Sequence, residues 1–209
     1  MEIGVLGAGG VGVTLAKGWL RKGHSICFGS RDPRSEKMHA AIKETGVGAR
    51  SASLAEAASQ AEVVVLTTPW AGTEEAVRAA GDLNGKPLLD VTNPLGPDLQ
   101  LAIQPGTSAA ELVSQWSPGA RVVKIFNTVG SSIMANPQLS SGPATMLYCG
   151  DDAEAKRIAH ALAEDLGFEP LDAGPLRQAR LLESFAALWI SLAFGAGLGR
   201  EFAFRLETR

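Results

Sequence analysis

The sequence has few cysteines and histidines and little imbalance of charge, features on which many functional classes depend. Its 209 residues carry 19 Lys and Arg against 22 Asp and Glu, a net charge of −3, which gives no reason to expect a nucleic-acid partner. Three histidines and two cysteines, without metal-ligand spacing, indicate no metal site. Cys27 and Cys149 fall in expected strands, so we expect buried free thiols, as suits a reducing compartment.

Long apolar runs are also missing. The apolar stretch 184–199 carries no charged residue, but it is shorter than the roughly 20 residues that span a bilayer, and glycines interrupt it. We expect no membrane partner. We interpret the stretch as a helix that a partner subunit covers or that lies over a substrate pocket, with simple core packing as the alternative. A strand is expected from Ile3, which leaves no room for a signal peptide, so we expect a cytoplasmic protein.

A glycine-rich turn near the start is the strongest motif present. Residues 3–6 predict a short buried strand, and the apolar spacing in 13–22 predicts a helix. Between them lies a G-x-G-x-x-G pattern made by Gly7, Ala8, Gly9, Gly10, Val11 and Gly12. This order of strand, turn and helix is typical of dinucleotide binding. Gly7 permits the turn, Gly9 lets a pyrophosphate approach the backbone, and Gly12 lets the helix pack closely on the strand. The helix N-terminus attracts the phosphates.

The end of the second expected strand, 25–29, decides which dinucleotide binds. NAD-binding proteins carry an acidic residue there that bonds the ribose 2′-hydroxyl. The position falls on Ser30, which is followed by Arg31, and Arg34 is near. A hydroxyl and two guanidinium groups suit a 2′-phosphate, so we expect NADP(H). Asp32 leaves NAD as the alternative, should the strand end two residues later, although an Asp-Pro pair is typical of a turn beyond the strand.

Strand and helix patterns alternate along the rest of the chain. Further strands are expected at 49–52, 63–66, 87–91, 121–126, 145–149 and 169–172. Helices are expected at 35–45, 54–60, 73–80, 108–116 and 153–166, with a short loop or helix at 130–136 and mostly helix after 175. This alternation predicts a Rossmann-type, doubly wound α/β fold with a mostly parallel sheet and a small helical C-terminal portion. We divide the chain into an NADP-binding domain, 1–140, and a C-terminal portion, 141–209, that continues the sheet and carries the acceptor site and dimer helices.

Four expected strands end in small polar or proline residues. Ligands of such sheets bind at the carboxyl ends of the strands. Beside the glycine turn, we expect one site lined by Thr67, Thr68, Pro69, Trp70, Asn93, Pro94 and Asn127. The residues at 67–70 would flank the nicotinamide ribose, and Asn93 and Asn127 would lie near the nicotinamide and the acceptor. The alternative is that these residues only cap loops, and that Trp70 fills the core. The long Pro- and Gly-rich loop at 95–107 is typical of a functional segment.

These motifs resemble a known family, the NADP-dependent oxidoreductases of the coenzyme F420 reductase type. The resemblance runs almost end to end and is carried by the blocks 29–31, 66–70, 123–128, 149–152, 171–176 and 179–183. It implies NADPH bound through Ser30, Arg31 and the glycine loop, hydride transfer to a deazaflavin, and a homodimer. The block 126–128 is more similar to the NADPH domain of six-transmembrane metalloreductases, where the acceptor is a flavin. We therefore expect a small-molecule acceptor, either F420 or a flavin.

Hydride transfer between these cofactors requires no nucleophile from the protein. We accordingly expect no catalytic acid–base side chain; Lys124 is the only candidate on a central strand. Two other functions stay open. A small carbonyl or imine reductase would share the nucleotide domain, but it usually needs a long helical C-terminal domain. A non-catalytic NADP-binding sensor would bind the nucleotide and reduce nothing.

Overall fold

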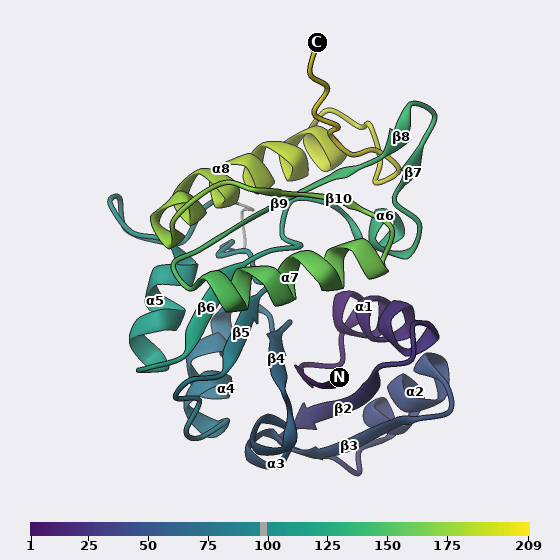
Figure 1. Cartoon of the computed structure of the whole chain (residues 1–209), viewed down its shortest axis with the longest axis vertical. Helices are drawn as coiled ribbons and strands as arrows, with labels where there is room; N and C mark the ends of the chain where they lie inside the picture. Colours follow the sequence, from purple (N-terminus) through teal and green to yellow (C-terminus); the bar gives the residue numbers. More distant parts are fainter. Residues whose placement is uncertain (97–99) are drawn as a thin grey trace.

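One mostly parallel sheet forms the centre of the computed structural model, which describes residues 1–96 and 100–209 (Figure 1). Within these residues the sheet has eight strands in the order β10-β9-β6-β5-β4-β1-β2-β3. In chain order the strands are β1 Glu2–Leu6, β2 Ser25–Ser30, β3 Ala49–Ser53, β4 Val63–Leu66, β5 Pro87–Asp90, β6 Arg121–Lys124, β9 Thr145–Gly150 and β10 Glu169–Asp172. A separate hairpin, β7 Gln138–Leu139 and β8 Gly142–Pro143, lies outside the sheet.

Helices cover both faces of the sheet. They are α1 Gly10–Arg21, α2 Glu36–Thr45, α3 Leu54–Gln60, α4 Thr73–Ala79, α5 Ala109–Trp116, α6 Ser131–Ala135, α7 Ala153–Asp165 and α8 Ala179–Ile190. Two hydrophobic clusters follow the faces: α1, α2, α6 and α7 pack in one, and α3, α4, α5 and α8 in the other. The alternation of strands and helices therefore produces the predicted doubly wound fold.

The strand order reverses between β1 and β4. β1 pairs with β2 on one side and with β4 on the other, all parallel, so the chain leaves the sheet in opposite directions from this point. β9 is the exception to parallel pairing, since it runs antiparallel to β6, and β10 then pairs parallel with β9. Such a reversal leaves a crevice at the carboxyl ends of the neighbouring strands, which is where ligands of open α/β sheets bind.

Both cysteine predictions are confirmed. Cys27 and Cys149 are buried free thiols, each 0% exposed. Burial raises the pKa of the Cys149 thiol to about 12. The thiol is therefore uncharged near neutral pH, and its position in the β9 strand gives it the packing role of a small apolar side chain.

The C-terminal region differs from its prediction. The expected apolar helix at 184–199 is too long, because α8 ends at Ile190 and a π-helical turn, η3 Ser191–Gly195, closes it. Gly197 and Gly199 adopt φ of 73° and 74°, which stop further helix. The tail at 196–209 is not helical, and within it the Phe204 carbonyl accepts a hydrogen bond from the Thr145 N–H of β9.

Other predictions differ by a few residues or fall outside the description. The sixth strand ends at Lys124 and not at Phe126, since Phe126 has a positive φ of 61° that a strand does not accommodate. The expected loop at 95–107 contains residues 97–99, which lie outside the described residues. Among the helices that the structure describes, none combines the length and apolarity needed to cross a membrane. The division at residue 140 stays a prediction.

Candidate nucleotide-binding site

The glycine turn lies at the carboxyl end of β1, in the crevice. Gly7 has a φ of 115°, a conformation that favours glycine, so the turn depends on it. A Cβ at Gly12 would come within 2.4 Å of the Gly7 carbonyl oxygen, whereas a Cβ at Gly9 would meet nothing within 4 Å. α1 begins beyond Gly9 with no side-chain cap and no acidic residue in its first turn. The unpaired N–H groups of α1 and the open space at Gly9 together fit a pyrophosphate.

The end of β4 is fastened to this turn. The Thr67 hydroxyl reaches the carbonyl oxygens of Leu6 and Gly7, at 3.2 Å and 2.9 Å. Thr68 and Pro69 follow, and Trp70 begins a 3₁₀ turn, η1 Trp70–Gly72, that leads into α4. The Trp70 ring lies 5.5 Å from that of Trp116, so it also contributes to packing, as the alternative interpretation supposed.

Two adjoining cavities run along the glycine turn. The β2-side cavity has a volume of about 370 Å³ and is lined by Gly7, Ala8, Gly29, Ser30, Arg31, Ser35, Lys37, Met38, Leu54, Thr68, Pro69, Gly72, Glu75 and Ala76. The β5-side cavity, also about 370 Å³, is lined by Gly7, Ala8, Gly9, Gly10, Val11, Lys37, Thr67, Thr68, Pro69, Trp70, Val91, Thr92 and Asn93. The two cavities share Gly7, Ala8, Lys37, Thr68 and Pro69, so together they form an elongated site across the crevice.

Most of the predicted site residues line one of these cavities. Four do not: Gly12, Arg34, Pro94 and Asn127. Gly12 lies beneath the turn, where it allows close packing, and Arg34 is exposed on the loop before α2. Pro94 and Asn127 are buried behind Asn93 at the edge of the sheet. The structure thus brings together the glycine turn, the end of β2 and the loops after β4 and β5.

The end of β2 supplies the charge of the β2-side cavity. β2 ends at Ser30, so Asp32 lies beyond the strand, as expected. Asp32 is occupied within its own turn, where its carboxylate accepts from the Arg34 N–H at 3.2 Å and its N–H donates to the Ser30 hydroxyl at 3.1 Å. The Arg31 guanidinium meets Glu75 of α4 at 3.1 Å, across the cavity.

Lys37 is a cavity residue that the sequence analysis missed. It lies in the first turn of α2, it is exposed, and it lines both cavities at the point where they join. Within the described part of the chain it forms no ion pair, so its ammonium group is available to an anionic ligand. The signal that could have found it is a cation in the first turn of the helix that follows the second strand.

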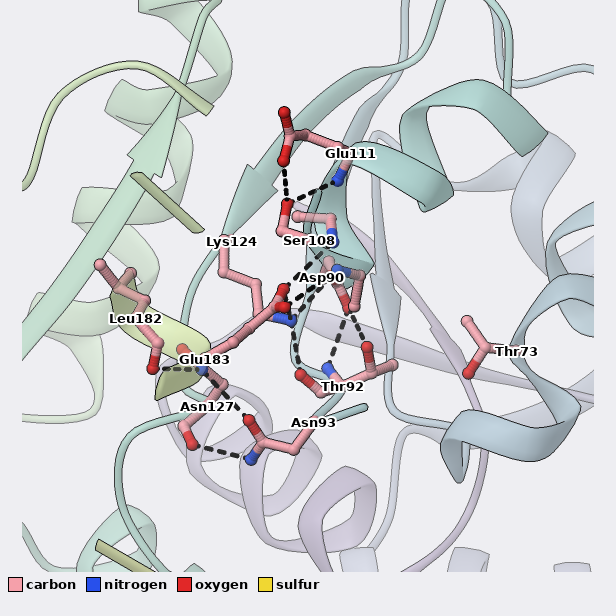
Figure 2. A network of polar contacts seen from close by, with 12 residues as sticks. Thr73, Asp90, Thr92, Asn93, Ser108, Glu111, Lys124, Asn127, Leu182 and Glu183 are labelled. Carbon is pink, nitrogen blue, oxygen red and sulfur yellow. Dashed lines mark hydrogen bonds and ion pairs between the residues drawn. The ribbon is translucent and has the colours of Figure 1, made fainter. Parts of the chain in front are cut away.

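A buried polar network lies below the β5 edge of the site (Figure 2). Lys124 is fully buried, and its Nζ donates to Asp90 Oδ2 at 2.9 Å and to the Thr92 carbonyl at 2.5 Å. Glu183 of α8 lies 3.3 Å from the same Nζ and accepts from the N–H groups of Ala109 and Ala110 at 2.9 Å and 3.2 Å. Burial raises the pKa of Glu183, against the opposing effect of Lys124. Lys124 lines neither cavity, so the structure places this candidate acid away from them.

Comparison with known proteins identifies the fold's relatives. Residues 2–94 match the profile of the family described as NADP oxidoreductase coenzyme F420-dependent. The crystal structure of a candidate F420-dependent NADP reductase from Arthrobacter sp. FB24 is 32% identical, covers 100% of each chain and superposes with a TM-score of 0.89. The chain belongs to this family. It is accordingly an NADP-dependent oxidoreductase by family.

Other similar proteins match this chain over different shares of their own length. The F420-dependent NADP reductase of Methanothermobacter marburgensis is 29% identical over 92% of each chain. Metalloreductase STEAP3 of Rattus norvegicus is 32% identical over 88% of this chain, but the match covers 36% of that protein. The chain therefore spans about a third of the length of that metalloreductase. A reductive aminase from Aspergillus terreus, solved with NADPH, is 21% identical with a TM-score of 0.70, which shows the shared fold alone.

Two glycine substitutions separate folding from binding at the turn. We expect Gly12→Ala to lower the thermal midpoint of unfolding, because its Cβ would meet the Gly7 oxygen at 2.4 Å. Gly9→Ala should leave the midpoint nearly unchanged but weaken NADPH binding, since its Cβ enters the open space beside α1. Differential scanning fluorimetry and NADPH titration of both variants test this. Full NADPH affinity in Gly9→Ala would contradict the assignment.

Proposed function

We propose that this protein transfers hydride between NADPH and a small-molecule acceptor, which is a deazaflavin of the F420 type or a flavin. The observation that carries the proposal is the pair of cavities that adjoin at the glycine turn, with cations at one end and the loops after β4 and β5 at the other. An elongated site of this kind suits a dinucleotide laid across the switch point of the sheet.

Each end of the site has a proposed role. The pyrophosphate would be held by Gly7, Ala8, Gly9, Gly10 and Val11, over the close packing that Gly12 permits. Ser30, Arg31 and Arg34 would recognise the 2′-phosphate, with Lys37 between the two phosphate positions. Thr67, Thr68, Pro69 and Trp70 would flank the nicotinamide ribose. Asn93 would face the nicotinamide, with Pro94 and Asn127 supporting it from outside the cavity.

The bound nicotinamide supplies the hydride chemistry itself. The contribution of the chain is to bind, to orient and to exclude water. Thr67 holds the ends of β1 and β4 together through its two hydrogen bonds, which keeps the two halves of the site at a fixed separation. The buried Val91 gives this end of the cavity an apolar side chain, and the hydroxyl of the buried Thr92 is occupied by Asp90. We propose no acid–base role for a side chain.

Two kinds of relative support the choice of acceptor. The Methanothermobacter relative, which matches over 92% of each chain, is an F420-dependent NADP reductase and favours a deazaflavin. The metalloreductase match leaves a flavin open. We expect NADPH oxidation with F420, FMN or FAD, and not with a ferric chelate alone. Spectrophotometric assays with the four acceptors in parallel test this. NADPH binding without oxidation by any of them would favour a sensor, and turnover of small imines or carbonyls would favour a reductase of that class.

The nucleotide preference gives a second prediction. We expect Arg31→Ala to weaken NADPH binding by about 10- to 150-fold, the loss of a charge-assisted hydrogen bond, and to leave NADH binding nearly unchanged. Titrations of both nucleotides measure the ratio. Arg78→Ala is the matched control, because Arg78 pairs with Glu74 on α4 and lines neither cavity. Equal losses for NADPH and NADH in Arg31→Ala would refute the role of Arg31.

We further propose a homodimer that covers the exposed side of α8. Leu181, Leu188 and Phe194 are 64%, 51% and 52% exposed, an apolar surface that water disfavours. We expect light scattering at micromolar concentration to give a dimeric mass, and Leu188→Glu to give a monomer because it places a charge in the interface. A monomeric wild-type protein would contradict this proposal.

A further inference from the structure

Asn93 has a side-chain amide whose orientation is fixed from behind the cavity. Its Nδ2 donates to the Asn127 backbone carbonyl at 2.9 Å, and its Oδ1 accepts from Asn127 Nδ2 at 3.2 Å (Figure 2). Rotation of the amide by a half turn would set donor against donor and acceptor against acceptor. Each end of the amide retains further hydrogen-bonding capacity, one N–H and one lone pair. Asn93 lines the β5-side cavity, so this remaining capacity is placed where a ligand binds.

Asn127 is held in its turn by two neighbouring elements. Its Nδ2 also donates to the Leu182 carbonyl of α8 at 3.2 Å, and the residue is 4% exposed. Phe126 before it has a φ of 61°, which is uncommon for a non-glycine residue, and its buried ring packs on Trp19 and Phe168. The surrounding core therefore imposes the bend that aims Asn127 at Asn93.

Asn127 also carries a buried acceptor without a partner. Its Oδ1 has no hydrogen bond within the described structure, although its Nδ2 contacts two acceptors. An unsatisfied buried acceptor destabilises the folded state and offsets part of what the two hydrogen bonds of Asn127 Nδ2 contribute. Stability alone is therefore a weak reason for an asparagine here, and the orientation of Asn93 supplies a further one.

α8 is itself held in place by buried contacts with α5 and β6. Glu183, which follows Leu182, accepts from the N-terminal N–H groups of α5 and meets Lys124. Lys124 in turn donates to the Thr92 carbonyl, immediately before Asn93. Both sides of Asn93, its backbone and its amide, are thus set by buried groups that do not line the cavity.

We propose that Asn127 is a positioning residue that orients the Asn93 amide toward the carboxamide of the nicotinamide. The inference rests on the proposed function. The nicotinamide carboxamide presents one carbonyl oxygen and one NH₂ group, the same donor and acceptor set as an asparagine side chain. Two amides pair only when donor faces acceptor, so a fixed Asn93 selects one rotation of the carboxamide and with it the orientation of the ring. Binding of the adenosine half of the nucleotide, which would lie near Arg31, should not depend on the orientation of Asn93.

The test compares NADPH with 2′,5′-ADP, which lacks the nicotinamide half. We expect Asn127→Leu to fold with a modest fall in its unfolding midpoint, because it loses the two hydrogen bonds of Asn127 Nδ2 together with the unsatisfied oxygen. It should lose about 3- to 10-fold in NADPH affinity, as expected for one neutral hydrogen bond, and nothing in 2′,5′-ADP affinity. Asn93→Ala should lose at least as much, because Asn127→Leu keeps the backbone carbonyl that accepts from Asn93 Nδ2, and the double variant should lose no more than Asn93→Ala, because Asn127 acts through Asn93. Asn127→Asp, which keeps the shape and removes both donors, should show the same split between the two ligands.

Arg180→Gln is the matched control. Arg180 joins α8 to Glu111 of α5 at the surface and contacts neither asparagine, so we expect no change for either ligand. Parallel losses of NADPH and 2′,5′-ADP in Asn127→Leu, or additive losses in the double variant, would overturn the positioning role. If wild-type protein bound 2′,5′-ADP and NADPH equally weakly, the proposed function would fail and this inference with it.

Discussion

The structure depends on how closely the first helix approaches the first strand. At Gly12 a side chain would come within 2.4 Å of the Gly7 oxygen and 2.7 Å of the Thr67 hydroxyl, so the backbone of α1, the turn and the end of β4 are in direct contact. That contact sets the N-terminal N–H groups of α1 facing the crevice between β1 and β4. The cavities therefore lie at the switch point beside free N–H groups, an arrangement that suits the phosphates of the proposed nucleotide.

The strength of the Arg31–Glu75 ion pair, compared with that of a guanidinium–phosphate hydrogen bond, decides which partner Arg31 prefers. Arg31 and Glu75 are 76% and 64% exposed, and a pair so exposed to water contributes at most about 1 kcal/mol. A charge-assisted hydrogen bond from a guanidinium to a phosphate contributes about 1.5–3 kcal/mol. Under the proposed function, a 2′-phosphate would therefore displace Glu75 from Arg31. Glu75 meanwhile keeps the guanidinium across the mouth of the cavity, near the place where the phosphate is expected. Lys37 would not have to give up a carboxylate to bind a phosphate, because within the described residues it has no carboxylate partner.

The sequence predicted the parts of the fold that local rules govern. The apolar runs of the central strands β1, β4 and β5 located them to within a few residues, because parallel central strands are buried on both faces. The antiparallel direction of β9 and the end of α8 were not predictable in this way, since they follow from tertiary pairing and from two left-handed glycines. The site was predicted at its loops, yet Lys37 was missed, because its place in the cavity depends on how α2 packs beside the turn. The network of Lys124 and Glu183 joins residues 59 positions apart, which no local pattern reveals.

Burying the charges of Lys124, Asp90 and Glu183 below the site costs free energy of folding, so stabilisation alone does not account for them. A buried ion pair is often no more stabilising than apolar residues of the same volume, whereas removal of one partner leaves a charge unpaired and costs about 3–5 kcal/mol. Lys124 is shared by Asp90 and Glu183, each 0% exposed, so no member can be lost alone. The same groups hold the Thr92 backbone and the first N–H groups of α5. An apolar core would pack these elements but would not specify their relative register, because it has no directional bonds. The network thus joins Thr92 after β5, the start of α5 and Glu183 of α8 by directional bonds. Under the proposed function, a fixed geometry at that edge is what hydride transfer would require of a protein that supplies position.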